Sequence, residues 1–178
     1  MTRRVAIVLR GPPCSGKTRV KNILLRKLQS ASFVSLDDGW GVDEKRFRGV
    51  DPYADLRVNT DVLIIELGFG EPAGEMSAGA TRNPGGWLGV LADEKRTVHL
   101  FLLQPPIAEV FRRIEHDRPP GSEAYFRHAA VRYKPNGVCS AEAFNERLGG
   151  AYQEMCLDTS LESESETARR ILEAVGLN

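Results

Sequence analysis

The sequence Val5–Thr18, VAIVLRGPPCSGKT, decides the fold of this 178-residue chain. An apolar run of strand length leads directly into Gly11–Thr18, which fits the pattern G-x-x-x-x-G-K-[ST]. Between a strand and a helix, this pattern predicts a P-loop, whose backbone N–H groups surround a phosphate while the following helix adds its positive end. The sequence therefore predicts a binding site for a nucleoside triphosphate and magnesium.

The P-loop residues have distinct expected roles. Lys17 is expected to reach the β and γ phosphates, and the hydroxyl of Thr18 to hold magnesium. The other expected phosphate-binding residues are Gly11, Pro12, Pro13, Cys14, Ser15 and Gly16. The alternative is a simple glycine turn with a solvated Lys17, and the flanking strand and amphipathic helix favour the P-loop over it.

Apolar runs of strand length alternate with helical stripes along the rest of the chain. Strands are expected at Val5–Leu9, Phe33–Leu36, Val62–Leu67 and Val98–Leu103, with a brief fifth near Glu154–Leu157. Stripes with helical spacing occupy residues 20–28, 107–114 and 168–175, and a further helix is expected after Asn83-Pro84. Ser163 and Glu166 are expected to cap the last of these stripes reciprocally. The alternation predicts a three-layer α/β domain with a mainly parallel sheet and helices on both faces.

Composition limits the classes of protein to consider. The length suits one domain over residues 1–178. Lys plus Arg and Asp plus Glu each number 24, so net charge does not favour nucleic acid or an anionic membrane as a partner. The three cysteines lack zinc-type spacing, and the first apolar run is too short for a secretory signal. A cytoplasmic protein without a membrane partner is expected, and no pattern indicates its oligomeric state.

Acidic residues follow two of the predicted strands. Asp37 is expected to orient an acceptor hydroxyl and accept its proton, with Asp38 as the rival for that role. Either carboxylate could instead hold magnesium through water, or form a turn before Gly39. Glu66 ends a buried strand, where a Walker B acid would hold the magnesium shell, although a polar strand end explains it equally well.

A basic segment at residues 111–121 ends in a Pro-Pro-Gly turn. Arginines on such a helix could close over a nucleotide and neutralise the charge that develops during phosphoryl transfer. Arg113 and Arg118 are the expected clamps, within a lid at about residues 112–135. A solvated helix face with acidic partners is the alternative for each of them.

Together, these features resemble the small P-loop kinases, in the branch that includes polynucleotide 5′-hydroxyl kinases, zeta-toxin-like kinases, gluconate kinase and chloramphenicol phosphotransferase. The residues that carry the resemblance are GPPCSGKT, Asp37-Asp38, Arg113, Arg118 and Asp158-Thr159-Ser160. The resemblance implies the strand order 2-3-1-4-5, Asp37 as the general base, an arginine lid, and adenine beside the segment that contains Thr159.

The resulting expectation is a kinase that transfers the γ-phosphoryl group of Mg-ATP to a hydroxyl of a small molecule or of a nucleic-acid 5′ end. The expected metal site comprises Thr18 and Asp37. ATP is favoured over GTP because no Asn-Lys-x-Asp motif is present. One alternative is a nucleotide monophosphate kinase, in which arginines in the region of Arg46, Arg48 and Arg57 would clamp an acceptor phosphate. The other is a non-catalytic ATP-binding module. Asp38, Arg48, Arg57 and Glu66 are the candidates for contact with the acceptor.

Overall fold

A computed structural model describes residues 4–29, 31–35, 61–67, 96–137 and 140–177. The strands are β1 (Arg4–Arg10), β2 (Ser32–Ser35), β3 (Val62–Glu66), β4 (Arg96–Leu103) and β5 (Glu154–Leu157). The helices are α1 (Lys17–Lys27), α6 (Ile107–Asp117), α7 (Glu123–Arg132), α8 (Ala141–Leu148) and α9 (Glu164–Val175).

The five strands form one parallel sheet in the order β2-β3-β1-β4-β5. Strand β1 lies at the centre, where Val5 is in register with Val62 of β3 and with Thr97 of β4. The predicted α/β class with a parallel sheet is confirmed. The order is the one that the resemblance implies, and the brief strand expected near Glu154–Leu157 is β5.

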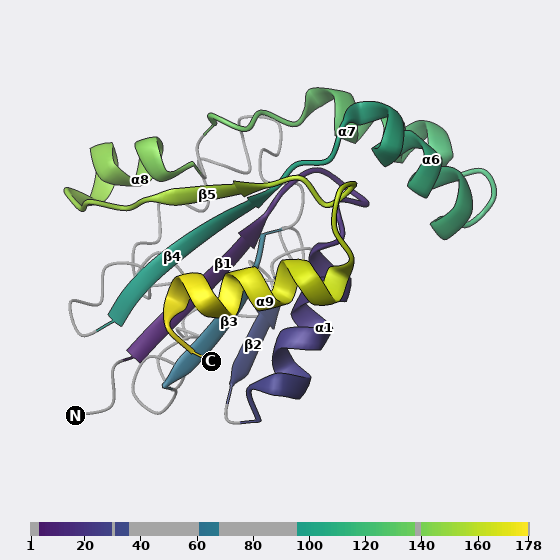
Figure 1. Ribbon diagram of the computed structural model, residues 1–178. Coiled ribbons are helices and arrows are strands. Elements are labelled where there is room, and N and C mark those ends of the chain that lie inside the picture. The colour runs from purple at the N-terminus through teal and green to yellow at the C-terminus, as the bar shows by residue number, and fades with distance from the viewer. Residues whose placement is uncertain (1–3, 30, 36–60, 68–95, 138–139, 178) are drawn as a thin grey trace, which may run out of the picture.

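Helices α1 and α9 lie side by side on one face of the sheet (Figure 1). The predicted apolar stripe of α9 is buried there, as are Val20 and Leu24 of α1. On the opposite face, Ala6 and Val8 of β1 are also fully buried. The described helices do not test the expectation of helices on both faces, because the one expected after Asn83-Pro84 lies outside the described residues.

Helix α9 is capped at both ends. The hydroxyl of Ser163 accepts a hydrogen bond from the backbone N–H of Glu166 at 3.2 Å, which caps the first turn. The predicted reciprocal arrangement is only half formed, since the Glu166 carboxylate pairs with Arg169. Gly176 ends the helix in the left-handed conformation that favours glycine.

Helices α6 and α7 form a hairpin beyond the carboxyl end of the sheet (Figure 1). This hairpin covers the predicted lid, but its first helix begins at Ile107, and the Pro-Pro-Gly turn leads into a second helix that periodicity did not predict. Val110, Ile114 and Ala130 form a small hydrophobic cluster of its own. None of the described helices combines the length and the apolar content needed to cross a membrane.

Candidate functional site: a phosphate-binding loop under an arginine hairpin

The P-loop leaves β1 through a backbone conformation that glycine allows. Gly11 has φ 149°, and a Cβ atom at this position would lie 2.2 Å from the carbonyl oxygen of Leu103 in β4. Any side chain would therefore collide with the backbone of the neighbouring strand. Cys14 also has a positive φ of 57°, and Gly16, at φ 99°, precedes the first turn of α1. The loop is thus fixed against the sheet at its start and against α1 at its end.

The side chain of Lys17 binds the backbone of the P-loop. Its ammonium donates to the carbonyl oxygens of Gly11 at 2.9 Å and Pro12 at 2.8 Å, and the residue is 5% exposed. This position at the base of the loop is the one a phosphate-binding lysine needs. Its role toward phosphate stays a prediction.

Thr18 and Glu66 meet beside the loop. The Thr18 hydroxyl donates to Glu66 Oε1 at 2.5 Å, and the ammonium of Lys21 lies 3.5 Å from Glu66 Oε2. Hydroxyl and carboxylate oxygens are suitable ligands for Mg²⁺, which favours hard oxygen ligands and keeps several waters. The two side chains therefore fit a magnesium site. Glu66 faces Thr18 at the end of β3, as a Walker B acid would.

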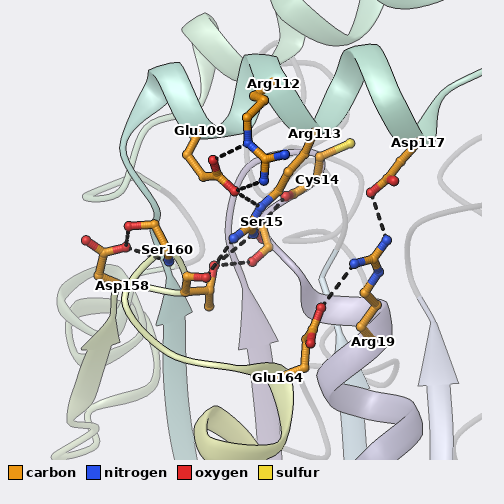
Figure 2. A network of polar contacts seen from close by, with 11 residues as sticks. Cys14, Ser15, Arg19, Glu109, Arg112, Arg113, Asp117, Asp158, Ser160 and Glu164 are labelled. Carbon is orange, nitrogen blue, oxygen red and sulfur yellow. Dashed lines mark hydrogen bonds and ion pairs between the residues drawn. The ribbon is translucent and has the colours of Figure 1, made fainter.

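Arg113 ties α6 to the P-loop and to the segment after β5 (Figure 2). Its Nη2 donates to the Thr159 carbonyl at 2.6 Å, and its Nη1 donates to the Thr159 hydroxyl at 3.1 Å and to the Cys14 carbonyl at 3.4 Å. The Thr159 hydroxyl in turn donates to the Ser15 carbonyl at 2.8 Å. Arg113 thus holds three segments together in addition to facing the cleft.

The carboxylate of Glu109 anchors the other side of Arg113. Its Oε1 accepts from Arg113 Nε at 2.7 Å, and both of its oxygens accept from Arg112. Hydrogen bonds from Arg112 and Arg113 lower the pKa of Glu109 to about 2. The carboxylate is therefore ionised at neutral pH and fixes the orientation of both guanidinium groups.

Arg118 reaches the loop with fewer protein partners than Arg113. Its Nε lies 3.3 Å from the sulfur of Cys14, and its guanidinium carbon lies 4.2 Å from the centre of the Phe126 ring. The ring supports the guanidinium through a cation–π contact. This leaves the arginine at the wall of the cleft, where a phosphate would lie.

Arg19 is a site residue that the sequence analysis did not identify. Its guanidinium binds Asp117 of α6 at 3.1 Å and Glu164 of α9 at 3.0 Å (Figure 2). The hydrogen bond that Arg19 donates to Glu164 and the charge of Asp117 raise the pKa of Arg19. Arg19 follows Thr18 directly, so its position in the sequence was a usable signal, but both partners lie far along the chain.

A cleft of about 610 Å³ joins these groups. The described residues that line it are Pro13, Cys14, Ser15, Gly16, Lys17, Thr18, Arg19, Glu66, Arg113, Asp117, Arg118, Tyr125, Phe126 and Glu164. Most of the expected nucleotide-binding residues thus share one cleft, while Thr159 is buried beneath the loop. Tyr125 and Phe126 come from α7, the helix that sequence reasoning missed. Asp37, Asp38, Arg48 and Arg57 lie outside the described residues.

A second polar cluster joins the P-loop strand to the end of the hairpin. Arg10, the last residue of β1, is fully buried, and its Nη1 donates to both carboxylate oxygens of Glu154 in β5, at 2.7 and 2.5 Å. Its Nη2 donates to the carbonyl of Pro135, three residues after α7. The strand that leads into the loop is thereby connected to the segment in which the hairpin ends.

No protein-family model matches the chain, and no curated protein matches it in sequence. Solved structures match over its whole length. The tunicamycin resistance protein of Deinococcus radiodurans is 20% identical over 99% of this chain and 98% of its own, with a TM-score of 0.57. The YorR protein of Bacillus subtilis, solved in complex with phosphorylated GDP, is 17% identical over 97% of this chain and 96% of its own, with a TM-score of 0.55.

A fungal RNA kinase is similar to 100% of this chain at 14% identity and a TM-score of 0.60. The match covers 45% of that kinase, so the present chain spans less than half of its length. At these identities the likeness concerns the fold. The chain shares its fold with these proteins, among them an RNA kinase, in agreement with the fold that the sequence resemblance implies.

Proposed function

We propose that the protein is a magnesium-dependent kinase that transfers the γ-phosphoryl group of ATP to a hydroxyl of a small molecule or of a nucleic-acid 5′ end. The observation that carries the proposal is the convergence of Lys17, the Thr18–Glu66 pair and Arg118 on one cleft. Lys17 and Thr18 begin α1, Glu66 ends β3 and Arg118 follows α6. Phosphoryl transfer requires groups of these kinds around one phosphate.

The loop amides and Lys17 would bind the β and γ phosphates and hold the reacting phosphoryl group in place. Thr18 would hold magnesium and Glu66 its water shell, and magnesium, when bound, would neutralise charge on the phosphate oxygens. Arg118 would neutralise charge that develops on the transferring group from the opposite wall. Arg113, which is held by its protein partners, would help to neutralise this charge and would keep α6 in a fixed position beside the loop.

Asp37 would orient the acceptor hydroxyl and accept its proton. This assignment rests on the sequence and on the resemblance to small P-loop kinases, because the segment after β2 lies outside the described residues. Asp38, Arg48 and Arg57 belong to the same segment and would contribute to recognition of the acceptor. The zero net charge favours a small acceptor over a long nucleic acid.

The proposal is tested by labelled-phosphate transfer from Mg-ATP to a panel of nucleosides, nucleoside monophosphates, sugars, antibiotics and 5′-hydroxyl oligonucleotides. We expect transfer to a hydroxyl acceptor, and a loss of about 100- to 1,000-fold in turnover for Lys17→Ala, as for removal of one transition-state donor. Asp37→Asn should lower turnover while ATP binding persists.

The matched control is Lys27→Ala, which removes an exposed lysine from the other end of the same helix. It should leave transfer unchanged. Transfer to monophosphates alone would replace the proposal by a nucleotide monophosphate kinase. Tight ATP binding without turnover on any acceptor would replace it by a non-catalytic ATP-binding module.

A further inference from the structure

Lys21 stands beside the expected magnesium site without belonging to the loop motif. It lies three residues after Thr18, so both side chains project from the same face of α1. Its ammonium lies 3.5 Å from Glu66 Oε2, while the Thr18 hydroxyl occupies Glu66 Oε1. Both oxygens of the carboxylate therefore have partners on one helix.

The ion pair between Lys21 and Glu66 is energetically important because both side chains are largely buried. The side chain of Lys21 is 12% exposed and that of Glu66 is 2% exposed. A buried carboxylate without a positive partner is strongly unfavourable, so a cation beside it matters far more than one at the surface. In the protein alone, the ammonium of Lys21 provides that compensation.

We propose that Lys21 is the counter-ion of Glu66 when no metal is bound, and that it thereby sets the affinity of the site for Mg²⁺. The inference rests on the proposed function, which places magnesium at Thr18 and Glu66. A divalent cation near Glu66 would share the carboxylate with the ammonium and would be repelled by it. Lys21 therefore stabilises the empty site and weakens the binding of magnesium alone.

This role has a consequence for the order of binding. Magnesium that arrives with nucleotide brings phosphate oxygens as further ligands, whereas magnesium alone must compete with Lys21 for one carboxylate. Lys21 therefore makes the site bind magnesium together with nucleotide in preference to magnesium alone. A purely structural ion pair would stabilise the fold without changing the response to Mg²⁺.

The test is thermal unfolding of the full chain during a titration with MgCl₂ alone, at constant ionic strength and without nucleotide. Lys21→Met should lower Tm in the absence of Mg²⁺, because Glu66 then lacks its counter-ion. It should also lower the midpoint Mg²⁺ concentration of the Tm increase by about tenfold, because the competing charge is gone. Lys21→Gln, which is neutral but can still donate to Glu66, should shift the midpoint in the same direction.

The matched control is Lys27→Met, the same substitution at an exposed position of the same helix, which should keep the midpoint of the unaltered protein. The double variant Lys21→Met/Glu66→Gln should recover Tm relative to Lys21→Met and lose the response to Mg²⁺. Unchanged midpoints in both Lys21 variants, or an equal shift in Lys27→Met, would overturn the inference. If Lys21→Met does not fold at any Mg²⁺ concentration, the midpoint of Lys21→Gln decides.

These measurements use neither ATP nor an acceptor, so they separate the two proposals. A shifted Mg²⁺ midpoint in a protein that transfers no phosphate would support the role of Lys21 and contradict the kinase proposal. Phosphate transfer with unshifted midpoints would support the kinase proposal and contradict the role of Lys21.

Discussion

The sheet with α1 and α9 and the α6–α7 hairpin face each other across the cleft, and they are stabilised differently. Among the residues that the structure describes, the hydrophobic cluster of the first region contains fourteen buried side chains, drawn from four strands and both helices. The cluster of the hairpin contains three buried side chains, and Phe111, Phe126 and Cys14 pack against it. Cys14 belongs to the P-loop, so the hairpin completes its own small core with a residue of the other region.

The polar contacts differ in the same way. Lys17, Glu66 and Arg10 are buried. Lys17 binds the loop backbone, Glu66 accepts from Thr18 of α1, and Arg10 binds Glu154 of β5. On the hairpin, Arg112 and Arg127 form ion pairs at the surface. Exposed pairs contribute little to stability, whereas burial makes the loss of one partner costly. We infer that the sheet side sets the geometry of the phosphate site and that the hairpin can adjust to what binds.

The largest loss of stability is expected at the contact that joins the two regions, between Arg10 and Glu154. Arg10→Met leaves Glu154 without its buried partner and should lower the free energy of unfolding by about 3–5 kcal/mol. The exposed arginine of the hairpin provides the control, since Arg112→Met should change stability by less than about 1 kcal/mol. Urea denaturation measures both. Equal changes for the two variants would contradict the contrast between buried and surface ion pairs.

A matched pair of isoleucines compares the two hydrophobic clusters directly. Ile171 of α9 and Ile114 of α6 are both 0% exposed. Ile171→Ala should lower the free energy of unfolding by about 2–5 kcal/mol. Ile114→Ala should lower it by about 1–2 kcal/mol, because the hairpin can open locally and its small cluster can collapse.

Urea denaturation gives the stabilities, and amide hydrogen exchange shows where the protein opens. Faster exchange confined to α6 and α7 is expected for Ile114→Ala. Equal stability losses with faster exchange throughout would show that the hairpin and the sheet unfold as one unit.

The two hairpin arginines that line the cleft, Arg113 and Arg118, should separate activity from stability. Arg118→Ala should lower turnover about 10- to 100-fold, because a charge-neutralising group is lost, and change the free energy of unfolding by less than about 0.5 kcal/mol. Arg113→Ala should lower both, since Arg113 also binds Thr159 and Glu109. Phosphate-transfer kinetics and thermal unfolding measure the two effects. An Arg118→Ala protein with full turnover would remove Arg118 from the proposed machinery.

The smallest expected effect is the pH dependence of the stability that Glu109 contributes. The pKa of Glu109 is lowered from an ordinary value near 4.5 to about 2, so its ionised form stabilises the fold above pH 4.5. That contribution is lost as the pH falls from about 4.5 toward 2, where the carboxylate takes up a proton. Glu109→Gln should therefore be less stable than the unaltered protein at pH 7, with the difference shrinking in acid. The difference is expected to be small because the Glu109 side chain is partly exposed, so water screens its charge.

Local signals in the sequence were sufficient to predict the structure of the region that carries the P-loop. The glycines, Lys17 and Thr18 lie within one stretch of eight residues between a buried strand and an amphipathic helix, so their arrangement follows from the sequence itself. The apolar stripe of α9 and its Ser163 cap were readable for the same reason. These features depend on neighbours three or four residues away.

The missed features depend on distant partners or on weak periodicity. Helix α7 buries only Ala130 and exposes Val131, so it has little of the amphipathic pattern that identifies a helix. Helix α8 is short, and only its caps, Ser140 and Gly149, mark it. The partner of Arg10 is 144 residues away, and no local pattern indicates such a pair. The proton acceptor at Asp37 stays a prediction.

The glycine at position 11 also bears on how the fold can be re-engineered. Its lack of a side chain lets the loop rest against the carbonyl of Leu103, the last residue of β4, so the start of the loop and the root of the hairpin keep a fixed spacing. Exchange of the hairpin between Gln104 and Pro135 for one from another P-loop protein should leave this junction intact. The cleft wall that carries Arg113 and Arg118 then becomes a module that can be exchanged, while the start of the phosphate-binding loop remains native.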